Sequence, residues 1–268
     1  MSVLAAIQMS SGPDTDENLE VAAGLINKAA AGGATLAVLP ENFSLMPIDD
    51  TSRIAESEIE GSGPVQDFLS AMAREHGLWL VGGTFPLRQE STKKIRACCM
   101  VYDQTGARVS RYDKLHLFDV DLENGESYRE SDYIESGNQI VVTDTPVGRL
   151  GLSVCYDLRF PEVYRQLSQE GARILSIPSA FTAITGRAHW EILLRSRAIE
   201  NQAYVIAPAQ WGEHASGRRT YGDTMIVGPW GDILARRFSG IGVVFAEVDD
   251  SRLDGIRHHF PSLDHRHL

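Results

Sequence analysis

The sequence contains little cysteine and lacks the patterns that would give its cysteines a structural or metal-binding role. Three cysteines occur in 268 residues, and two of them, Cys98 and Cys99, are adjacent. Three cysteines do not make a disulfide framework, and no CxxC pair or HExxH motif indicates a zinc site. We therefore expect no disulfide, metal or organic cofactor. Cys98 and Cys99 are expected to face opposite sides of one strand as packing residues.

The sequence also lacks long apolar runs and any excess of positive charge. No apolar segment approaches the roughly 20 residues that a membrane-spanning helix needs. Residues 1–20 have neither the basic nor the apolar region of a secretory signal. The net charge of −11 argues against a general affinity for nucleic acid or anionic membranes. We therefore expect a protein of the reducing cytoplasm without nucleic-acid or membrane partners.

Short apolar runs alternate with amphipathic segments along the chain. Val3–Met9 is typical of a strand, and Asp16 is expected to cap the helix after it. Further helices are predicted over Pro64–His76, ended by Gly77, and over about Arg187–Asn201. Two hairpins are predicted at turn-forming residues 103–106 and 146–149. This order predicts an α/β fold of mixed sheets, and roughly a dozen strands favour two packed sheets with helices outside.

No linker or low-complexity tract divides the chain. We expect a single domain over residues 1–268, with a C-terminal tail from about residue 256. The last twelve residues, RHHFPSLDHRHL, are rich in histidine. A solvated or subunit-contacting tail is favoured there over a metal site.

Three reactive side chains follow predicted strands at equivalent points. Glu41 follows LAVLP, Lys114 follows ARVSRYD, and Cys155 follows GRLGLSV. Taken alone, Glu41 and Lys114 are more typical of the surface, and Cys155 fits a buried packing residue as well as a reactive thiol. Side chains at the carboxyl ends of strands converge on ligand crevices in layered α/β folds. Their shared placement therefore favours one common site.

A carboxylate, an ammonium and a thiol that meet in one site can cleave a C–N bond. The carboxylate can take the thiol proton and later deliver a proton to the leaving amine. The sulfur attacks a carbonyl or nitrile carbon and forms a covalent intermediate. The ammonium and the backbone N–H of Tyr156 can stabilise the oxyanion. We also expect the ammonium to favour the thiolate before attack, because a nearby positive charge lowers the pKa of a cysteine.

Three segments resemble the signatures of the nitrilase superfamily, the carbon–nitrogen hydrolases: LPENF, YDKLHLFDVDL and GLSVCYDLRFPEVYR. The resemblance covers essentially the whole chain. It implies a four-layer αββα sandwich, usually paired as a homodimer, with Glu41 as general base and acid, Lys114 as oxyanion stabiliser and Cys155 as nucleophile. It also implies a second glutamate that positions the lysine, and Glu130 is the matching residue. A carboxylate there would keep the amine charged.

Other segments, among them SAFTAITGRAHWE, resemble the Nit subgroup of this family. The resemblance implies a small anionic amide as substrate: deaminated glutathione, cleaved to 2-oxoglutarate and Cys-Gly in metabolite repair. The neighbouring ω-amidases act instead on 2-oxoglutaramate or 2-oxosuccinamate. A catalytically inactive member that serves as a binding or scaffold protein is the alternative of another class, which the intact triad disfavours.

Because the protein is acidic overall, an anionic substrate needs local cations. The candidates are Arg159 and Arg129, with Arg187 nearby, and a bidentate arginine–carboxylate contact would orient the substrate. For Arg159 a salt bridge to Asp157 or Glu162 is an equally good interpretation. Further candidate lining residues of the acyl pocket are Tyr156, Phe181, Thr182 and Trp211, although a core position suits the tryptophan as well.

A cysteine–histidine pair is the other common thiol device, and His116 and His189 are the histidines to consider. No papain-type signature surrounds Cys155. Structural roles are therefore favoured for both histidines.

Overall fold

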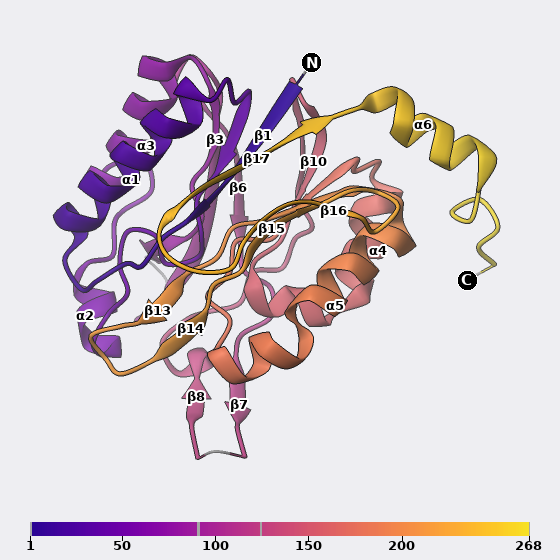
Figure 1. The fold of residues 1–268 in the computed structure, drawn as a ribbon. Helices are drawn as coiled ribbons and strands as arrows, with labels where there is room; N and C mark the ends of the chain where they lie inside the picture. Colours follow the sequence, from indigo (N-terminus) through magenta and orange to yellow (C-terminus); the bar gives the residue numbers. More distant parts are fainter. Residues whose placement is uncertain (1, 90–91, 124, 268) are drawn as a thin grey trace.

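The computed structural model describes residues 2–89, 92–123 and 125–267. Within these ranges, two β-sheets pack face to face and helices cover both outer faces (Figure 1). The expected four-layer αββα sandwich is confirmed. The layers follow from the sequence, since the strands are apolar on both faces and need cover on both sides.

The first sheet has seven strands in the described part of the chain, in the order β17-β1-β2-β3-β5-β4, with β6 also paired to β5. β1, β2 and β3 are parallel, and the remaining pairs are antiparallel. The strands are β1 (Ser2–Gln8), β2 (Leu36–Val38), β3 (Trp79–Val81), β4 (Phe85–Arg88), β5 (Ile95–Tyr102), β6 (Arg108–Asp113) and β17 (Gly242–Val248).

The second sheet has six strands within the described ranges, in the order β16-β15-β12-β11-β10-β9. β10, β11 and β12 are parallel, so this sheet is mixed too. Its strands are β9 (Val142–Thr145), β10 (Gly148–Leu152), β11 (Ile174–Ser176), β12 (Tyr204–Ala207), β15 (Thr224–Val227) and β16 (Ile233–Arg237). Two hairpins stand apart from the sheets: β7 (Asp119–Asp121) with β8 (Ser127–Arg129), and β13 (Trp211–Glu213) with β14 (Arg219–Tyr221).

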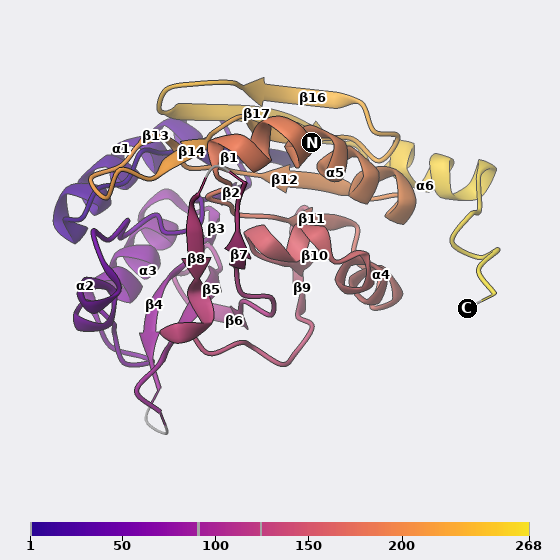
Figure 2. The same cartoon turned by 90° about the horizontal axis from the view of Figure 1, so that it is seen from below.

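The helices divide between the two outer faces. α1 (Thr15–Ala31) and α3 (Pro64–His76) cover the first sheet, and α4 (Pro161–Gln169) and α5 (Ala183–Asn201) cover the second (Figures 1 and 2). The short α2 (Asp50–Ala55) lies beside β4, and α6 (Asp250–His259) extends away from the sandwich with the C-terminus. α6 continues to His259, so the first residues of the tail expected from about residue 256 are helical.

Most of the predicted elements are confirmed, and the differences concern helix starts. α3 spans the predicted Pro64–His76, and Gly77 ends it in the left-handed conformation, with φ of 59°. α1 is capped by Asp14 rather than Asp16: the Asp14 carboxylate accepts from the Glu17 N–H at 3.0 Å. α5 begins about one turn before the predicted Arg187, because the Thr182 side chain caps it.

The adjacent cysteines of β5 illustrate the layering. Cys98 packs in the core between the first sheet and its helices, whereas Cys99 packs in the core between the two sheets. Both are fully buried, which confirms the prediction that they face opposite ways as packing residues.

Candidate active site

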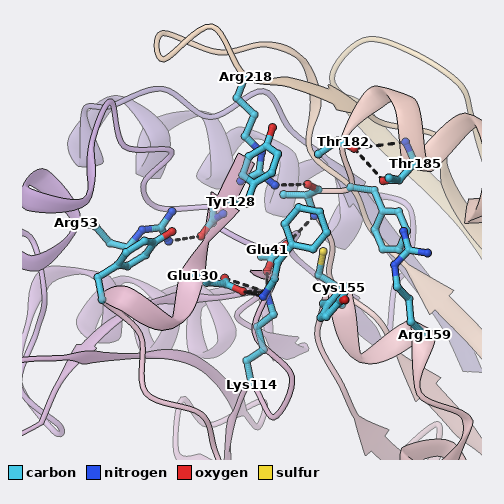
Figure 3. Close-up of a pocket in the computed structure, with 16 residues that line it drawn as sticks. Glu41, Arg53, Lys114, Tyr128, Glu130, Cys155, Arg159, Thr182, Thr185 and Arg218 are labelled. Carbon is cyan, nitrogen blue, oxygen red and sulfur yellow. Dashed lines mark hydrogen bonds and ion pairs between the residues drawn. The ribbon is translucent and has the colours of Figure 1, made fainter. Parts of the chain in front are cut away.

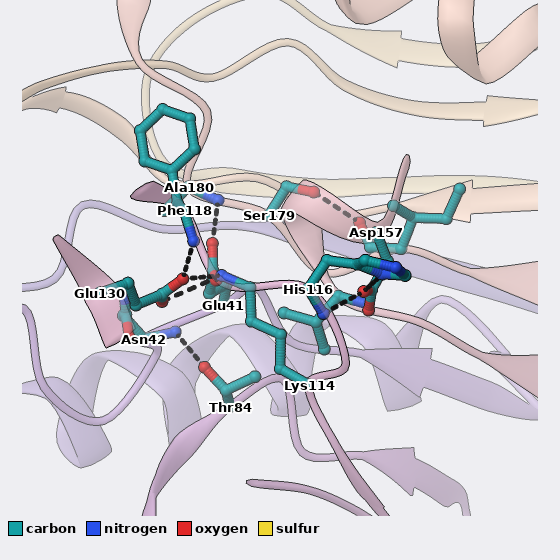
Figure 4. Close-up of polar contacts among 12 residues, drawn as sticks. Glu41, Asn42, Thr84, Lys114, His116, Phe118, Glu130, Asp157, Ser179 and Ala180 are labelled. Carbon is teal, nitrogen blue, oxygen red and sulfur yellow. Dashed lines mark hydrogen bonds and ion pairs between the residues drawn. The ribbon is translucent and has the colours of Figure 1, made fainter. Parts of the chain in front are cut away.

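Lys114 lies directly after β6, and its ammonium is buried between two carboxylates (Figure 4). Lys114 Nζ is 2.8 Å from Glu41 Oε1 and 2.8 Å from Glu130 Oε2. Glu130 Oε2 also accepts from the Phe118 N–H at 2.7 Å, which fixes the carboxylate against the loop before β7. The structure thus brings together three residues that are far apart in the sequence.

Glu41 sits in a loop three residues after β2, where the two sheets face each other. Its Oε2 accepts from the backbone N–H of Ala180, which belongs to the second sheet's loops, at 2.8 Å. The loop that follows β3 approaches closely: a Cβ on Gly83 would lie 2.0 Å from the Pro40 carbonyl oxygen. A side chain there would displace the Glu41 loop, so glycine is needed at this position.

Cys155 begins the 3₁₀-helix Cys155–Arg159 that follows β10. Its φ of 47° is unusual for a residue with a side chain, and such a conformation costs on the order of 1–3 kcal/mol. The surroundings enforce it. The Cys155 N–H donates to the Pro178 carbonyl at 2.9 Å, and the buried Asp157 accepts from the Val154 N–H at 2.9 Å. The turn therefore holds the thiol at the end of the strand.

The thiol faces the Glu41–Lys114 pair. Cys155 and Glu41 lie within hydrogen-bonding reach of each other, and Cys155, Glu41, Lys114 and Glu130 line one cavity (Figure 3). The predicted convergence of the three strand-exit residues is therefore what the structure shows, with Glu130 beside them.

Burial and mutual charge set the protonation of this group. Burial alone would lower the pKa of Lys114, but Glu130 and Glu41 raise it well above its usual value. Burial alone would raise the pKa of Glu41, but Lys114, the Cys155 thiol and Arg218 hold it below the ordinary carboxyl range. The resting site therefore contains a permanent ammonium and an ionised carboxylate.

The expectation of a thiolate before attack is wrong. Burial raises the pKa of Cys155 well above its ordinary value, and the Glu41 charge raises it further. Lys114 acts in the expected direction but is outweighed. Cys155 thus rests as a neutral thiol beside an ionised base, and its proton must leave during the attack.

The cavity lining agrees with most of the predicted substrate-contacting residues. Tyr156, Arg159, Phe181 and Thr182 all line it. The Arg159 guanidinium lies over the Phe181 ring at 5.0 Å, and its Nη1 is 3.1 Å from His189 Nδ1. Neither of the acids considered for Arg159, Asp157 or Glu162, forms an ion pair with it among the described residues.

Two predicted arginines lie elsewhere. Arg129 forms an ion pair with Asp121 at 2.7 Å on the exposed face of the β7–β8 hairpin, outside the cavity. Arg187 and Trp211 line a different hollow, together with other residues of the β13–β14 hairpin. The structure therefore does not support Arg129 or Arg187 as contacts in this cavity.

Sequence reasoning missed several lining residues. They are Asn42, Arg53, Phe118, Tyr128, Tyr133, Thr185 and Arg218. Arg53 comes from α2 and Arg218 from the turn of the β13–β14 hairpin, and both segments resemble ordinary surface in the sequence. Thr185 follows from the earlier start of α5, which a Thr182 cap signal would have indicated.

The contacts of the two histidines agree with the structural roles predicted for them. His116 stacks on Phe160 with ring centroids 3.6 Å apart, and its Nδ1 is 2.8 Å from Asp157 Oδ1. Neither His116 nor His189 lines the cavity that holds Cys155. The other two cysteines rest as neutral thiols, because burial raises the pKa of Cys98 strongly and that of Cys99 to about 12.

Among the described residues, no group of three or more histidine, cysteine or acidic side chains is placed to hold a metal ion. Within the same ranges, no helix combines the length and apolarity required to cross a membrane.

Comparison with known proteins identifies the family to which this chain belongs. The carbon-nitrogen hydrolase model matches residues 3–258. The chain is 42% identical over 264 residues to the deaminated glutathione amidase of Yersinia enterocolitica, covering 98% of this chain and 92% of that protein.

Two solved structures with the same fold are 37% and 33% identical to this chain over the aligned residues. The NitFhit protein of C. elegans superposes with a TM-score of 0.92 at 37% identity, covering 99% of this chain. The chain spans 65% of that protein's length. Nit3 of Saccharomyces cerevisiae, described as a member of branch 10 of the nitrilase superfamily, superposes with a TM-score of 0.88 at 33% identity, covering 97% of this chain and 94% of that one.

Proposed function

The chain belongs to the carbon–nitrogen hydrolase family, and from this premise we propose that it is the amidase that cleaves deaminated glutathione to 2-oxoglutarate and Cys-Gly. The observation that carries the proposal is the buried Lys114 ammonium, held by Glu41 and Glu130 beside the Cys155 thiol. The name of the Yersinia enterocolitica relative, at 42% identity, supports the substrate.

In the proposed first step, Glu41 takes the thiol proton as the Cys155 sulfur bonds to the amide carbonyl carbon. The low pKa of Glu41 keeps it ionised and ready to accept. The carbonyl oxygen becomes an oxyanion, which Lys114 Nζ and the backbone N–H of Tyr156 stabilise. Glu130 aims the ammonium and keeps it charged.

In the second step, Glu41 gives its proton to the leaving nitrogen as the C–N bond breaks. Cys-Gly departs, and the 2-oxoglutaryl group remains on the sulfur as a thioester. Glu41 then removes a proton from water, which attacks the thioester carbonyl carbon. Collapse releases 2-oxoglutarate, and the sulfur regains a proton from Glu41.

The acyl group extends from Cys155 toward Arg159 in this proposal. Arg159 supplies the charge that a 2-oxoglutaryl carboxylate needs, and Phe181 and Tyr156 hold the guanidinium in place. Thr182 and Thr185 lie at the same end of the cavity (Figure 3), and their hydroxyls can bond to the acyl oxygens.

The decisive assay measures 2-oxoglutarate release from deaminated glutathione by the purified protein. We expect kcat/KM for this substrate to exceed that for 2-oxoglutaramate, which has the same acyl group but releases ammonia. A preference for 2-oxoglutaramate would assign the protein to the ω-amidases instead. Release from neither substrate would remove the proposed function.

The pH dependence follows from the protonation of the site. Glu41 must be ionised in the free enzyme, and its pKa lies below the ordinary value of 4.5. The pKa values of Lys114 and Cys155 lie well above 10.5 and 9.0 respectively. We therefore expect kcat/KM to be flat from about pH 6 to about pH 8.5. A limb with an apparent pKa near 8 in a kcat/KM profile would instead indicate a thiolate that forms before attack.

The resemblance to paired family members also supports a homodimer, formed by the same single domain of residues 1–268. Three isoleucines on the outer face of α5 are exposed: Ile184 at 48%, Ile192 at 67% and Ile199 at 52%. A second copy that packs on this face would bury them. Sedimentation of the full chain as a monomer at micromolar concentration would contradict the dimer.

A cytoplasmic location is part of the same proposal. It is supported by the three cysteines, which are all free and buried. Recovery of the protein from the secreted or periplasmic fraction of its host would contradict this location.

A further inference from the structure

Three arginine side chains line the cavity around Cys155: Arg53, Arg159 and Arg218. In the part of the chain that the structure describes, none of them forms an ion pair with an acidic side chain. Unpaired guanidiniums are costly to desolvate. Three in one cavity indicate a ligand that carries more than one negative group.

The three arginines lie on opposite sides of the nucleophile. Arg159 is on the Cys155 side, over the rings of Tyr156 and Phe181. Figure 3 shows Cys155 between this residue and the group formed by Glu41, Lys114 and Glu130, with Arg53 beyond that group.

Arg53 and Arg218 each donate a hydrogen bond to a residue next to Glu41. One of these residues is next in the chain, and the other is a hydrogen-bond partner of Glu41. Arg53 Nη1 donates to Asn42 Oδ1 at 2.8 Å, and Asn42 follows Glu41 in the chain. Arg218 Nη2 donates to the Ala180 carbonyl at 2.6 Å, and the Ala180 N–H donates to Glu41 Oε2. Both guanidiniums therefore lie on the Glu41 side of the cavity.

The reaction requires the two sides of the cavity to bind different parts of the substrate. The acyl carbon bonds to the Cys155 sulfur, whereas the leaving nitrogen must receive its proton from Glu41. The amine part of the substrate therefore lies toward Glu41, and the acyl part lies away from it. Arg159 faces the acyl end, and Arg53 and Arg218 face the amine end.

Both amine-side arginines keep unused hydrogen-bonding capacity. Arg53 is only 7% exposed, yet its Nε has no hydrogen-bond partner in the described structure, and the same holds for the buried Nε of Arg218. Each guanidinium lies over an aromatic ring, Arg53 over Tyr133 at 5.5 Å and Arg218 over Tyr128 at 5.3 Å. Stacking of this kind holds a guanidinium in a fixed orientation for a carboxylate.

An outer cavity of about 360 Å³ continues from this end of the site. It shares four lining residues with the inner cavity: Arg53, Tyr128, Tyr133 and Arg218. Two acids also line it, and each already accepts a hydrogen bond from the protein. Asp49 caps α2 through the Ser52 N–H at 2.8 Å, and Glu126 accepts from the Tyr128 hydroxyl at 2.7 Å. A leaving group longer than ammonia therefore has room beyond Glu41.

We propose that Arg53 and Arg218 form a leaving-group subsite, which binds the carboxylate of an amino-acid or dipeptide amine and selects substituted amides over primary amides. The inference rests on the proposed function and deepens it. In an extended Cys-Gly leaving group, the terminal carboxylate lies about 7 Å from the scissile nitrogen, two residues along the chain. An enzyme that releases ammonia has no carboxylate to place at this end.

The test compares three substrates that share the 2-oxoglutaryl group: deaminated glutathione, its C-terminal amide, and 2-oxoglutaramate. We expect the wild-type protein to prefer the acid over its C-terminal amide by at least about tenfold in kcat/KM, because a charged hydrogen bond is lost. In Arg218→Gln this preference falls to about one, and kcat/KM falls about tenfold more for deaminated glutathione than for 2-oxoglutaramate.

Three controls distinguish binding of the leaving-group carboxylate from an effect of Arg218 on the position or charge of Glu41. Arg159→Gln, on the acyl side, lowers kcat/KM for all three substrates together and keeps the preference for the acid. Arg53→Lys keeps the charge of the buried side chain and reduces the preference only in part. Inhibition by added Cys-Gly weakens in Arg218→Gln, whereas inhibition by 2-oxoglutarate does not.

The outcomes are distinguishable. An equal loss on all three substrates in Arg218→Gln would overturn the subsite, since it would indicate support of Glu41 only. An acid-to-amide preference near one in the wild type would overturn it as well. Failure of the wild type to cleave any of the three would remove the proposed function itself, before any variant is compared.

Discussion

Replacing Cys155 with alanine is expected to lower kcat/KM for deaminated glutathione by at least about 10⁴, because no other thiol among the described residues lines the cavity. The fold should persist. The backbone turn is held by Asp157 and by the bond to the Pro178 carbonyl, neither of which involves the thiol. Steady-state kinetics and a thermal melt measure the two effects separately.

The matched control is Cys99→Ala, which removes a thiol from the core between the sheets. We expect it to lower Tm while leaving kcat/KM nearly unchanged. Mass spectrometry of wild-type protein quenched in acid during turnover should find the 2-oxoglutaryl group on Cys155. Activity of Cys155→Ala within tenfold of the wild type would exclude the acyl-cysteine mechanism, and absence of turnover by the wild type would favour the inactive scaffold.

Replacing Lys114 with methionine is expected to damage both catalysis and stability. The variant loses the cation that stabilises the oxyanion, which costs about 10³ in kcat/KM. It also leaves the buried Glu41 carboxylate and the partly buried Glu130 carboxylate without their shared partner. Removing one member of a buried ion pair costs about 3–5 kcal/mol of unfolding free energy, so Tm should fall clearly.

A pH profile gives a sharper signature of this variant. Burial raises the pKa of Glu41, and Lys114 is the main opposing influence. Without Lys114 the Glu41 pKa rises, so the carboxylate is protonated and inactive over a wider acid range. The residual activity should therefore increase with pH through the neutral region, where the wild-type profile is flat.

Lys114→Arg is the control, since it keeps the positive charge between the carboxylates. We expect an intermediate loss of activity and an acid limb close to that of the wild type. An unchanged Tm together with an unchanged acid limb in Lys114→Met would show that the ammonium does not hold Glu41 in its ionised form.

The elements and the triad were predictable because their signals are local. Proline at the start of a helix and glycine after its end mark α3 within the sequence itself. Glu41, Lys114 and Cys155 each follow an apolar run, and the ends of neighbouring strands in packed sheets meet at one edge. The resemblance to a family then implied that these three residues form one active site.

The protonation of the site could not be predicted in the same way. The sequence does not show how deeply Cys155 is buried. From charge alone, Lys114 is expected to lower the pKa of Cys155 and favour the thiolate. In the folded protein, desolvation and the Glu41 charge together outweigh the ammonium, and the pKa of the thiol rises instead.

The sequence alone determined the strands, the helices and the three reactive groups at strand ends, because these depend on residues that are neighbours in the chain. Only the tertiary structure decided which side chains face the substrate. On β8 the Tyr128 side chain lines the cavity, whereas the adjacent Arg129 forms an ion pair with Asp121 outside it. On the β13–β14 hairpin Arg218 lines the cavity, whereas Arg219 pairs with the exposed Glu213. Successive side chains of an extended segment point to opposite sides, so the choice between such neighbours depends on how the segment packs.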